Sequence, residues 1–313
     1  MKHSPITFEP IYMTRVWGGR QLETRYGRPL PDSQPYGESW ELVDREDEQS
    51  IVTSSNYAGL SLHELWTQKR KEIFGTDLPD SERFPLLIKI LDCQDDLSIQ
   101  VHPPAAIAPS LKGEPKTEMW YLAGAEEHSS LYIGFKNGVT RQQFEESIEN
   151  GTVADDIHRI SPHEGESIFI PSGRLHAIGG GNLIFEIQQN SDTTYRVFDW
   201  NRMGLDGQPR ELHVEESLAS IDFDDFEPQM DTPNGQTLAT CEYFRTDRLE
   251  LSTGAPLGNP SPNSFSIIAI VKGQLSSPEG LHKTGDFLLL PKGCSPLTSD
   301  QESVVLQVTL PTP

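Results

Sequence analysis

The sequence predicts a mainly β protein made of two related barrels and a few short helices. Short apolar or alternating segments bounded by Gly, Pro, Asn and Asp recur along its 313 residues, as they do in strands joined by turns. Its 25 glycines and 24 prolines favour many turns over long helices. A strand-and-turn pattern that occurs twice in the chain indicates the second barrel.

The expected strands are short and lie close together along the chain. In the first two thirds they are expected at 85–91, 98–101, 119–123, 130–134, 167–171, 182–188 and 194–200. Near the end of the chain they are expected at 242–251, 265–272, 286–291 and 303–310. Many short strands with few helices are typical of an antiparallel sandwich or barrel.

Helical signals are few. A first helix is predicted after Ser61, because Glu64 follows this cap at the spacing of a capping box. A second is predicted over 140–150, where a threonine cap opens the segment and Gly151 ends it. A third is expected near 210–221.

The repeated pattern divides the chain in two. Residues 165–173 and 285–293 share the spacing Gly-x5-Pro-x-Gly, and five mostly apolar residues precede each proline. In both copies a strand therefore enters a turn. The first copy continues to His176, whereas the second has Pro296 at the matching position. We expect two related β-barrels, the second without a site; two unrelated strand-and-turn units are the alternative.

An acidic segment with two prolines, residues 222–236, is expected to be a linker. We therefore expect one domain over 1–228, which carries the site. A second β domain is expected over 229–313. It offers no set of candidate ligands, so we do not expect it to act in catalysis. Bracing the first domain, shaping its pocket and mediating assembly are the open alternatives for its role.

Composition narrows the class of protein. The chain has 25 Lys and Arg against 47 Asp and Glu, a net charge of −22, which argues against binding to nucleic acid or to anionic membranes. Its three cysteines are far apart and lack CxxC spacing, so neither a disulfide framework nor a thiolate zinc site is expected. With no secretory signal or long apolar run in view, we expect a soluble cytoplasmic protein. The sequence does not reveal its oligomeric state; a monomer is favoured.

The first copy of the repeat, with His176, resembles the second sequence motif of the cupin superfamily. In that motif an imidazole binds a metal inside a small barrel, so the resemblance implies further ligands earlier in the domain. Gln100 and His102 lie two residues apart on a predicted strand, as do Lys116 and Glu118, so each pair points to one face. Two imidazoles, a carboxylate and an amide oxygen suit zinc or another borderline divalent ion.

A longer set of motifs identifies a family. The chain resembles the type I mannose-6-phosphate isomerases in their short bacterial form, most strongly from about residue 8 to 213. The motifs that carry the resemblance are RVWGG (15–19), YGESW (36–40), FPLLIK (84–89), QVHP (100–103), KTEMWY (116–121), PSGRLHA (171–177) and EIQQNSDTTYRVFD (186–199). Pro115 departs from the pattern, because longer members tend to have a histidine there. Beyond about residue 226 the match is weak.

The resemblance implies a zinc-dependent enzyme with two jelly-roll barrels of the cupin type. It implies one zinc ion per chain at Gln100, His102, Glu118 and His176, although some short members bind metal through the last three alone. It also implies a catalytic arginine at Arg196. The substrates would be mannose 6-phosphate and fructose 6-phosphate, interconverted through an enediol.

An enediol mechanism needs a base that takes a proton from the sugar. Glu186, Asp192 and Lys116 are the candidates. A metal and an arginine near Lys116 would lower its pKa, yet the same residue is equally suited to hold the phosphate. The sequence leaves this choice open.

Two other functions compete with an isomerase. A sugar-phosphate-binding protein would keep the barrel and metal without turnover, and would be marked by loss of Arg196 or of residues 190–196, which are intact. A cupin oxygenase would use iron with open coordination positions. The polar residues around Arg196 favour a protein that binds a phosphorylated ligand over such an oxygenase.

Overall fold

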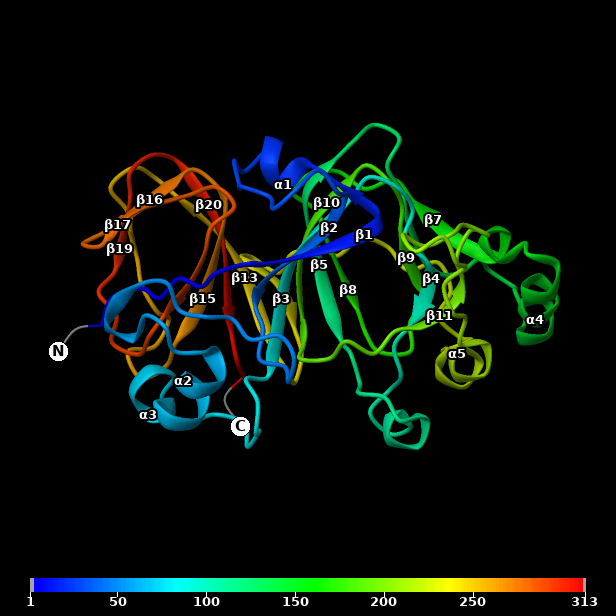
Figure 1. Cartoon of the computed structure of the whole chain (residues 1–313), viewed down its shortest axis with the longest axis horizontal. Coiled ribbons are helices and arrows are strands. Elements are labelled where there is room, and N and C mark those ends of the chain that lie inside the picture. Colours follow the sequence, from blue (N-terminus) through cyan, green and yellow to red (C-terminus); the bar gives the residue numbers. More distant parts are fainter. Residues whose placement is uncertain (1–2, 312–313) are drawn as a thin grey trace. The chain divides into compact units, whose positions relative to one another are not determined.

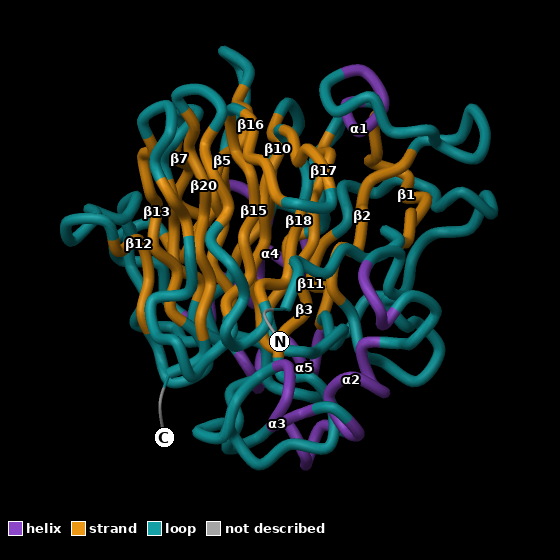
Figure 2. Tube along the Cα trace, turned by 90° about the vertical axis from the view of Figure 1, so that its left-hand side faces the viewer, coloured by secondary structure: helices purple, strands orange, loops and turns teal. Residues whose placement is uncertain are grey.

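The computed structural model describes residues 3–311, and strands make up most of its regular structure (Figure 2). Within that range the longest helix, α4 (Arg141–Asn150), has 10 residues. The prediction of a mainly β protein with a few short helices is therefore confirmed. No helix in this part of the chain has both the length and the hydropathy needed to cross a membrane.

The chain forms two compact units whose segments alternate along the sequence. The first, called the site unit, comprises Tyr12–Ser39 and Lys89–Asp231. The second unit comprises Trp40–Ile88 together with the described residues before Tyr12 and after Asp231. Every residue predicted to act in catalysis or metal binding lies in the site unit.

Two sheets account for most of the site unit (Figure 1). One contains β1 (Ile11–Gly19), β2 (Tyr36–Leu42), β3 (Leu86–Cys93), β5 (Glu118–Ala125), β8 (Ser167–Ile170) and β10 (Asn182–Gln189). The other contains β4 (Ile99–Val101), β6 (Leu131–Phe135), β7 (Ile157–Ile160), β9 (His176–Ile178) and β11 (Tyr195–Phe198). The strand orders are β1-β2-β3-β10-β5-β8 and β11-β4-β9-β6-β7.

The core of the site unit lies between these two sheets. Trp120 of β5 and Ile168 of β8 share one apolar cluster with Leu131 of β6 and Ile178 of β9, so the sheets face one another. Alternate residues of a strand point the same way. The strand that buries Trp120 in this core therefore carries Glu118, two residues earlier, toward the same interior.

Helix α4 covers the other side of the five-stranded sheet. Its Phe144 belongs to a second apolar cluster with Val101 of β4 and Ala177 of β9. The helix begins with a capping box between Thr140 and Gln143. It ends at Gly151, whose φ of 72° is the left-handed conformation that glycine adopts without strain. Both ends match the prediction for residues 140–150.

The remaining helices are short. They are α1 (Gln21–Thr24), α2 (Leu62–Gln68), α3 (Arg70–Ile73) and α5 (Val214–Ser220). Ser61 caps α2 through the predicted capping box with Glu64. Helix α5 confirms the third predicted helix, although it is shorter than the expected 210–221.

Two further sheets belong to the second unit. One contains β12 (Thr237–Thr240), β13 (Arg245–Leu251), β20 (Ser303–Thr309), β15 (Ser266–Lys272) and β18 (Phe287–Leu290), in that order. The other contains β14 (Pro256–Leu257), β19 (Leu297–Ser299), β16 (Gln274–Ser277) and β17 (Gly280–Lys283). Apolar residues of both sheets, among them Ile268 and Leu275, form one core.

The repeated pattern appears in both units as the same local structure. Strand β8 leads into the first turn and β18 into the second, as predicted. The glycines before the strands, Gly165 and Gly285, have φ of 94° and 89°. Those within the turns, Gly173 and Gly293, have φ of 94° and 68°. Positive φ at all four positions explains why glycine recurs in both copies.

Candidate active site

A cavity of about 540 Å³ opens in the site unit and collects most of the predicted site residues. Its walls include Gln100, Lys116, His176, Glu186, Asp192 and Arg196. Their positions follow from strand pairing. Gln100 of β4 lies opposite both His176 of β9 and Arg196 of β11, so these three residues form a row across one sheet. The opposing sheet supplies the acidic side of the site.

Strand pairing also places the acidic residues. Glu118 begins β5 and is paired with Gln188, and Trp120 is paired with Glu186. Directly paired residues of neighbouring strands have adjacent side chains. Trp120 Nε1 accordingly donates a hydrogen bond to Glu186 Oε1 at 3.1 Å. The indole thus fixes the position of the Glu186 carboxylate in the core.

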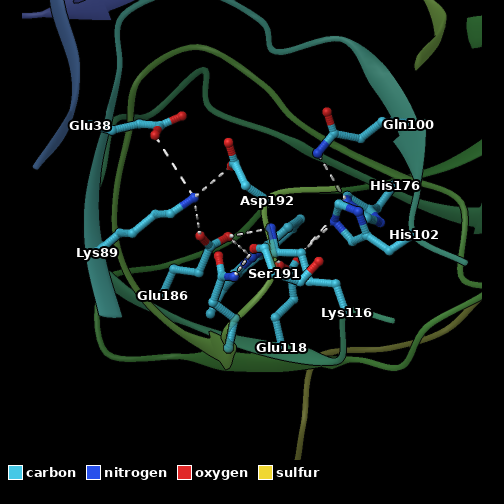
Figure 3. Close-up of polar contacts among 12 residues, drawn as sticks. Glu38, Lys89, Gln100, His102, Lys116, Glu118, His176, Glu186, Ser191 and Asp192 are labelled. Atoms are coloured by element: carbon cyan, nitrogen blue, oxygen red, sulfur yellow. Dashed lines mark hydrogen bonds and ion pairs between the residues drawn. The ribbon is translucent and has the colours of Figure 1, made fainter. Parts of the chain in front are cut away.

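His102, Glu118 and His176 form a compact group with metal-ligand chemistry (Figure 3). Glu118 Oε1 lies 3.6 Å from the Nε2 atom of each histidine. The candidate ligand atoms all lie within 4.8 Å of one another, and all three side chains are buried. Two imidazoles and a carboxylate converging on one point are a donor set typical of zinc and related divalent ions.

Backbone carbonyls fix the orientation of both imidazoles. His102 Nδ1 donates to the carbonyl of Thr193 at 2.8 Å, and His176 Nδ1 donates to that of Arg174 at 2.9 Å. Each Nε2 therefore keeps its lone pair for the interior, as in metal-binding histidines. Burial lowers the pKa of both rings, that of His176 to about 3, so both stay neutral at pH 7.

Three buried atoms of this group lack hydrogen-bond partners among residues 3–311: His102 Nε2 and both carboxylate oxygens of Glu118. Glu118 Oε2 forms an ion pair with Lys116, which leaves His102 Nε2 and Glu118 Oε1. Leaving buried polar atoms unpaired is unfavourable, and both are acceptors that point toward the same space. A bound cation would satisfy both of them, so these residues fit a metal ion.

Gln100 is close to the His-Glu-His group, but its amide nitrogen faces that group. Its Nε2 lies 3.3 Å from His176 Nε2, and its Oε1 accepts a hydrogen bond from Ser98 Oγ at 3.2 Å. An amide binds a metal ion through oxygen, so Gln100 would have to turn its amide over to become a ligand. The position of Gln100 suits a fourth ligand, whereas its present orientation does not.

Lys116 forms an ion pair with Glu118 of the His-Glu-His group. Its Nζ lies 2.7 Å from Glu118 Oε2 and 3.9 Å from Glu186 Oε1. Burial alone would lower the pKa of Lys116, but the two carboxylates outweigh burial and raise that pKa above its usual value. The acidic neighbours therefore dominate the pKa of Lys116 in this arrangement, where the sequence left its role open.

Glu186 has the pKa expected of a base that works near neutrality. Burial raises the pKa of this carboxyl most strongly, Lys116 opposes the rise, and the balance is a pKa of about 7. Its Oε2 accepts no hydrogen bond from any residue within 3–311. The only charged partner of this oxygen in the described range is Lys89, whose Nζ lies 3.6 Å away.

Sequence reasoning missed two further residues of the site, Lys89 of β3 and Glu38 of β2. Lys89 Nζ lies 3.6 Å from Glu186, 3.8 Å from Glu38 and 3.9 Å from Asp192 (Figure 3). Its side chain is buried and lines the cavity. The signal was present in the FPLLIK motif, because a lysine within an apolar strand needs buried acidic partners.

Asp192 and Arg196 complete the cavity wall. The Asp192 side chain is 51% exposed, so it lies where solvent meets the cavity. Arg196 donates to Ser98 Oγ at 3.2 Å and to the carbonyl of Glu211 at 3.1 Å. Neither partner is charged, and Arg196 forms no ion pair with residues of the described range. Its positive charge is therefore available to an anionic ligand.

Comparisons with known proteins show the family to which the chain belongs. Residues 6–128 match the family model for the catalytic domain of type I phosphomannose isomerase. Mannose-6-phosphate isomerase ManA of Bacillus subtilis is 36% identical over 307 residues, which cover 94% of this chain and 95% of that protein. The mannose-6-phosphate isomerase of Streptococcus mutans is 33% identical over 301 residues, covering 90% of this chain and 92% of that protein.

The fold is shared as well. The crystal structure of the mannose 6-phosphate isomerase from Bacillus subtilis aligns with this chain at a TM-score of 0.88 and 30% identity. The alignment covers 98% of this chain and 100% of the other. Similarity of this extent, in both sequence and fold, places the chain in the type I phosphomannose isomerase family as an isomerase.

Proposed function

We propose that the chain is a zinc-dependent enzyme that interconverts mannose 6-phosphate and fructose 6-phosphate. One observation carries the proposal: a cavity lined by His176 of the buried His-Glu-His group is also lined by a carboxyl with a pKa of about 7 and by an arginine without an ion pair within the described range. Family membership supports the reaction class, and the names of the relatives support mannose 6-phosphate as a substrate.

His102, Glu118 and His176 would hold the zinc ion, and Gln100 would join them after turning its amide. When bound, zinc supplies a Lewis acid that polarises the oxygens at the reacting carbons of the sugar. The buried acceptors without partners in this group, and the neutral imidazoles, support its role as a cation site.

Glu186 is our proposed base for the enediol step. Interconversion moves a proton from C2 to C1 of the sugar, or the reverse, and a carboxylate with a pKa of about 7 is suited to that transfer at neutral pH. Lys116 stays protonated beside Glu118. It is therefore suited to donate to a sugar oxygen. Asp192, at the solvent side, is placed to assist substrate binding or ring opening.

Arg196 is proposed to stabilise negative charge on the substrate. A guanidinium cannot readily give up its proton, so it acts through charge and hydrogen bonds. Its hydrogen-bond partners in this structure are a hydroxyl and a carbonyl, so its donors are not taken up by a carboxylate of the described range. Electrostatic stabilisation of this kind is often the largest contribution to catalysis.

We also propose that the fold is a pair of cupin barrels, with a catalytic domain over 1–228 and a degenerate domain over 229–313. The repeated turn supports this pairing, because its glycines adopt positive φ in both copies. The first copy leads to His176 and the second to Pro296, which supports catalysis by the first barrel alone.

A coupled assay of fructose 6-phosphate formation from mannose 6-phosphate tests the proposal. Activity should vanish after chelation and return when zinc is added back. A chain that binds mannose 6-phosphate without turnover in any metal state would be a sugar-phosphate-binding protein instead. Full turnover after complete chelation would refute the metal site while leaving the isomerase reaction intact.

A further inference from the structure

The segment between β11 and α5 forms a small hairpin over residues 203–209, here called the rim hairpin. Met203 and Pro209 face each other as an antiparallel bridge. Gly204 N donates to the carbonyl of Gln208 at 2.7 Å, and Gly207, with a φ of 75°, closes the turn. The hairpin is therefore a defined structure with its own hydrogen bonds.

One buried carboxylate anchors the hairpin at both ends. Asp199, whose side chain is 5% exposed, accepts from Arg202 Nη2 at 3.0 Å and from Arg210 Nε at 2.7 Å. These arginines stand immediately before and immediately after the hairpin. A buried carboxylate that holds two guanidinium groups fixes the base of the hairpin through charge-assisted hydrogen bonds.

The tip of the hairpin forms part of the cavity wall. Gly204, Leu205 and Asp206 all line the cavity. The hairpin carries two exposed apolar side chains, Met203 at 57% and Leu205 at 54%. Of these two, Leu205 lines the cavity and Met203 does not. A ligand that fills the cavity would therefore bury Leu205 and leave Met203 in water.

The same anchor supports the catalytic arginine. Arg210 is followed by Glu211, whose carbonyl accepts from the Arg196 guanidinium at 3.1 Å. His213 N in turn donates to the Arg196 carbonyl at 2.7 Å. Loosening the hairpin at Asp199 would thus disturb both the cavity wall and the guanidinium.

We propose that the rim hairpin covers the bound sugar phosphate, with Leu205 contacting the substrate and keeping water from the reacting carbons. Asp199 is the positioning residue that holds the cover in place. The inference rests on the proposed isomerase function. In that reaction the C2–H bond breaks, a C1–H bond forms and one proton passes from the C2 hydroxyl to the C1 oxygen. Water that reaches the site exchanges with the proton in transit.

Leu205→Ser and Met203→Ser form a matched pair on the same hairpin. Turnover of mannose 6-phosphate in D₂O gives both KM and the deuterium incorporated at C1 of fructose 6-phosphate per turnover. Leu205→Ser should raise KM about fivefold, the factor that half of a leucine side chain's burial provides, and should raise deuterium incorporation. Met203→Ser should match the wild type in both. Equal behaviour of the two variants would overturn the proposal.

Asp199→Asn tests the positioning role. It should raise deuterium incorporation as Leu205→Ser does, and it should also lower kcat because Arg196 loses its support. A loss of stability without a change in deuterium incorporation would show that Asp199 is merely structural.

A labelling experiment separates failure of the cover from failure of the proposed function. Leu205→Cys and Met203→Cys are alkylated with and without mannose 6-phosphate, and the modified peptides are quantified by mass spectrometry. Protection of Cys at 205 but not at 203 is expected. If the wild type turns over the sugar and neither position is protected, the cover is wrong. If there is no turnover but selective protection, the cover stands and the isomerase proposal fails; if neither occurs, both fail.

Discussion

Glu118 is the residue on which the charges of the site depend. Burial alone would raise the pKa of its carboxyl, but Lys116 at 2.7 Å and the two imidazoles hold that pKa well below its usual value. The carboxylate therefore stays ionised across the physiological pH range. One oxygen of the Glu118 carboxylate forms the ion pair with Lys116, and the other faces His102 and His176. An ionised carboxylate beside two neutral imidazoles is a donor set that suits a divalent cation.

Replacing Glu118 with Gln should weaken the binding of a divalent cation at this group. The amide keeps the volume but loses the charge, so affinity for zinc should fall by more than about a hundredfold, beyond what loss of a supporting residue causes. Zinc content after dialysis, measured by atomic absorption, checks this. Glu211→Gln is the control, because that side chain is 85% exposed and should leave zinc content unchanged. Full zinc occupancy in Glu118→Gln would contradict the ligand assignment.

The raised pKa of Glu186 leads to a prediction about the pH dependence of the reaction. Its pKa is raised to about 7, and a base must be deprotonated, so kcat/KM should fall as pH decreases below about 7. Glu186→Gln should lower kcat at least about a hundredfold, the usual contribution of a positioned base. Its residual activity should lose the acid limb of the pH profile.

Asp192→Asn provides the comparison for Glu186. Because the Asp192 side chain is half exposed, this variant should keep the acid limb near pH 7. If the limb moved with Asp192 and persisted in Glu186→Gln, the two roles would be exchanged.

At the scale of residues, the sequence located most of the site residues but not the ion pairs between them. The motifs identified Gln100, His102, Glu118 and His176, and the structure brings these four together. The sequence could not show that Lys116 forms an ion pair with Glu118, because an ion pair depends on side-chain conformations. Lys89 and Glu38 were also missed. Both lie within quoted motifs, but only the pairing of β2 and β3 with β10 and β5 in one sheet shows that they reach the site.

At the scale of elements, end signals proved more informative than periodicity. The caps of α2 and α4 were predicted to the residue, because a capping box involves neighbours in sequence. By contrast, β1 and β2 were missed. Both contain charged residues, Arg15 and Glu38, that pair with each other inside the site unit at 3.0 Å. A strand that buries paired charges does not show the alternation by which strands are recognised.

Gly151 offers a direct test of one such end signal. Its φ of 72° and ψ of 25° lie in the left-handed region, and a Cβ there would meet nothing within 4 Å. Gly151→Ala should therefore destabilise the fold through backbone strain alone, by about 1 kcal/mol. Gly151→Asn should recover part of this loss because asparagine tolerates that conformation. Urea unfolding at saturating zinc measures both; equal stability of alanine and glycine would refute the strain argument.

For the whole molecule, the sequence predicted two related parts with one boundary near residue 228, but not that an earlier segment joins the second part. Trp40–Ile88 belongs to the second unit, although it stands between two segments of the site unit. The repeated turn carries no information about this insertion, because it concerns one strand in each copy. Contacts far apart in sequence decide which unit a segment joins, and only the three-dimensional structure contains them.

The net charge of −22 leads to a last prediction about the whole molecule. Folding brings the excess carboxylates closer together than they are in the unfolded chain, so their repulsion destabilises the compact state. Raising NaCl from about 0.01 M to about 0.15 M shortens the screening length from about 30 Å to about 8 Å. The melting temperature at pH 7 should rise by several degrees, as followed by circular dichroism at fixed zinc concentration.

The control for this effect is the same titration near the isoelectric point. At a pH close to the sequence pI of about 4.7 the net charge approaches zero, so salt should no longer stabilise the protein and should weaken its remaining ion pairs instead. A salt effect of the same sign and size at both pH values would mean that specific ion binding, and not the excess of carboxylates, governs stability. A rise at pH 7 that disappears near pH 4.7 would identify repulsion among carboxylates as the cause.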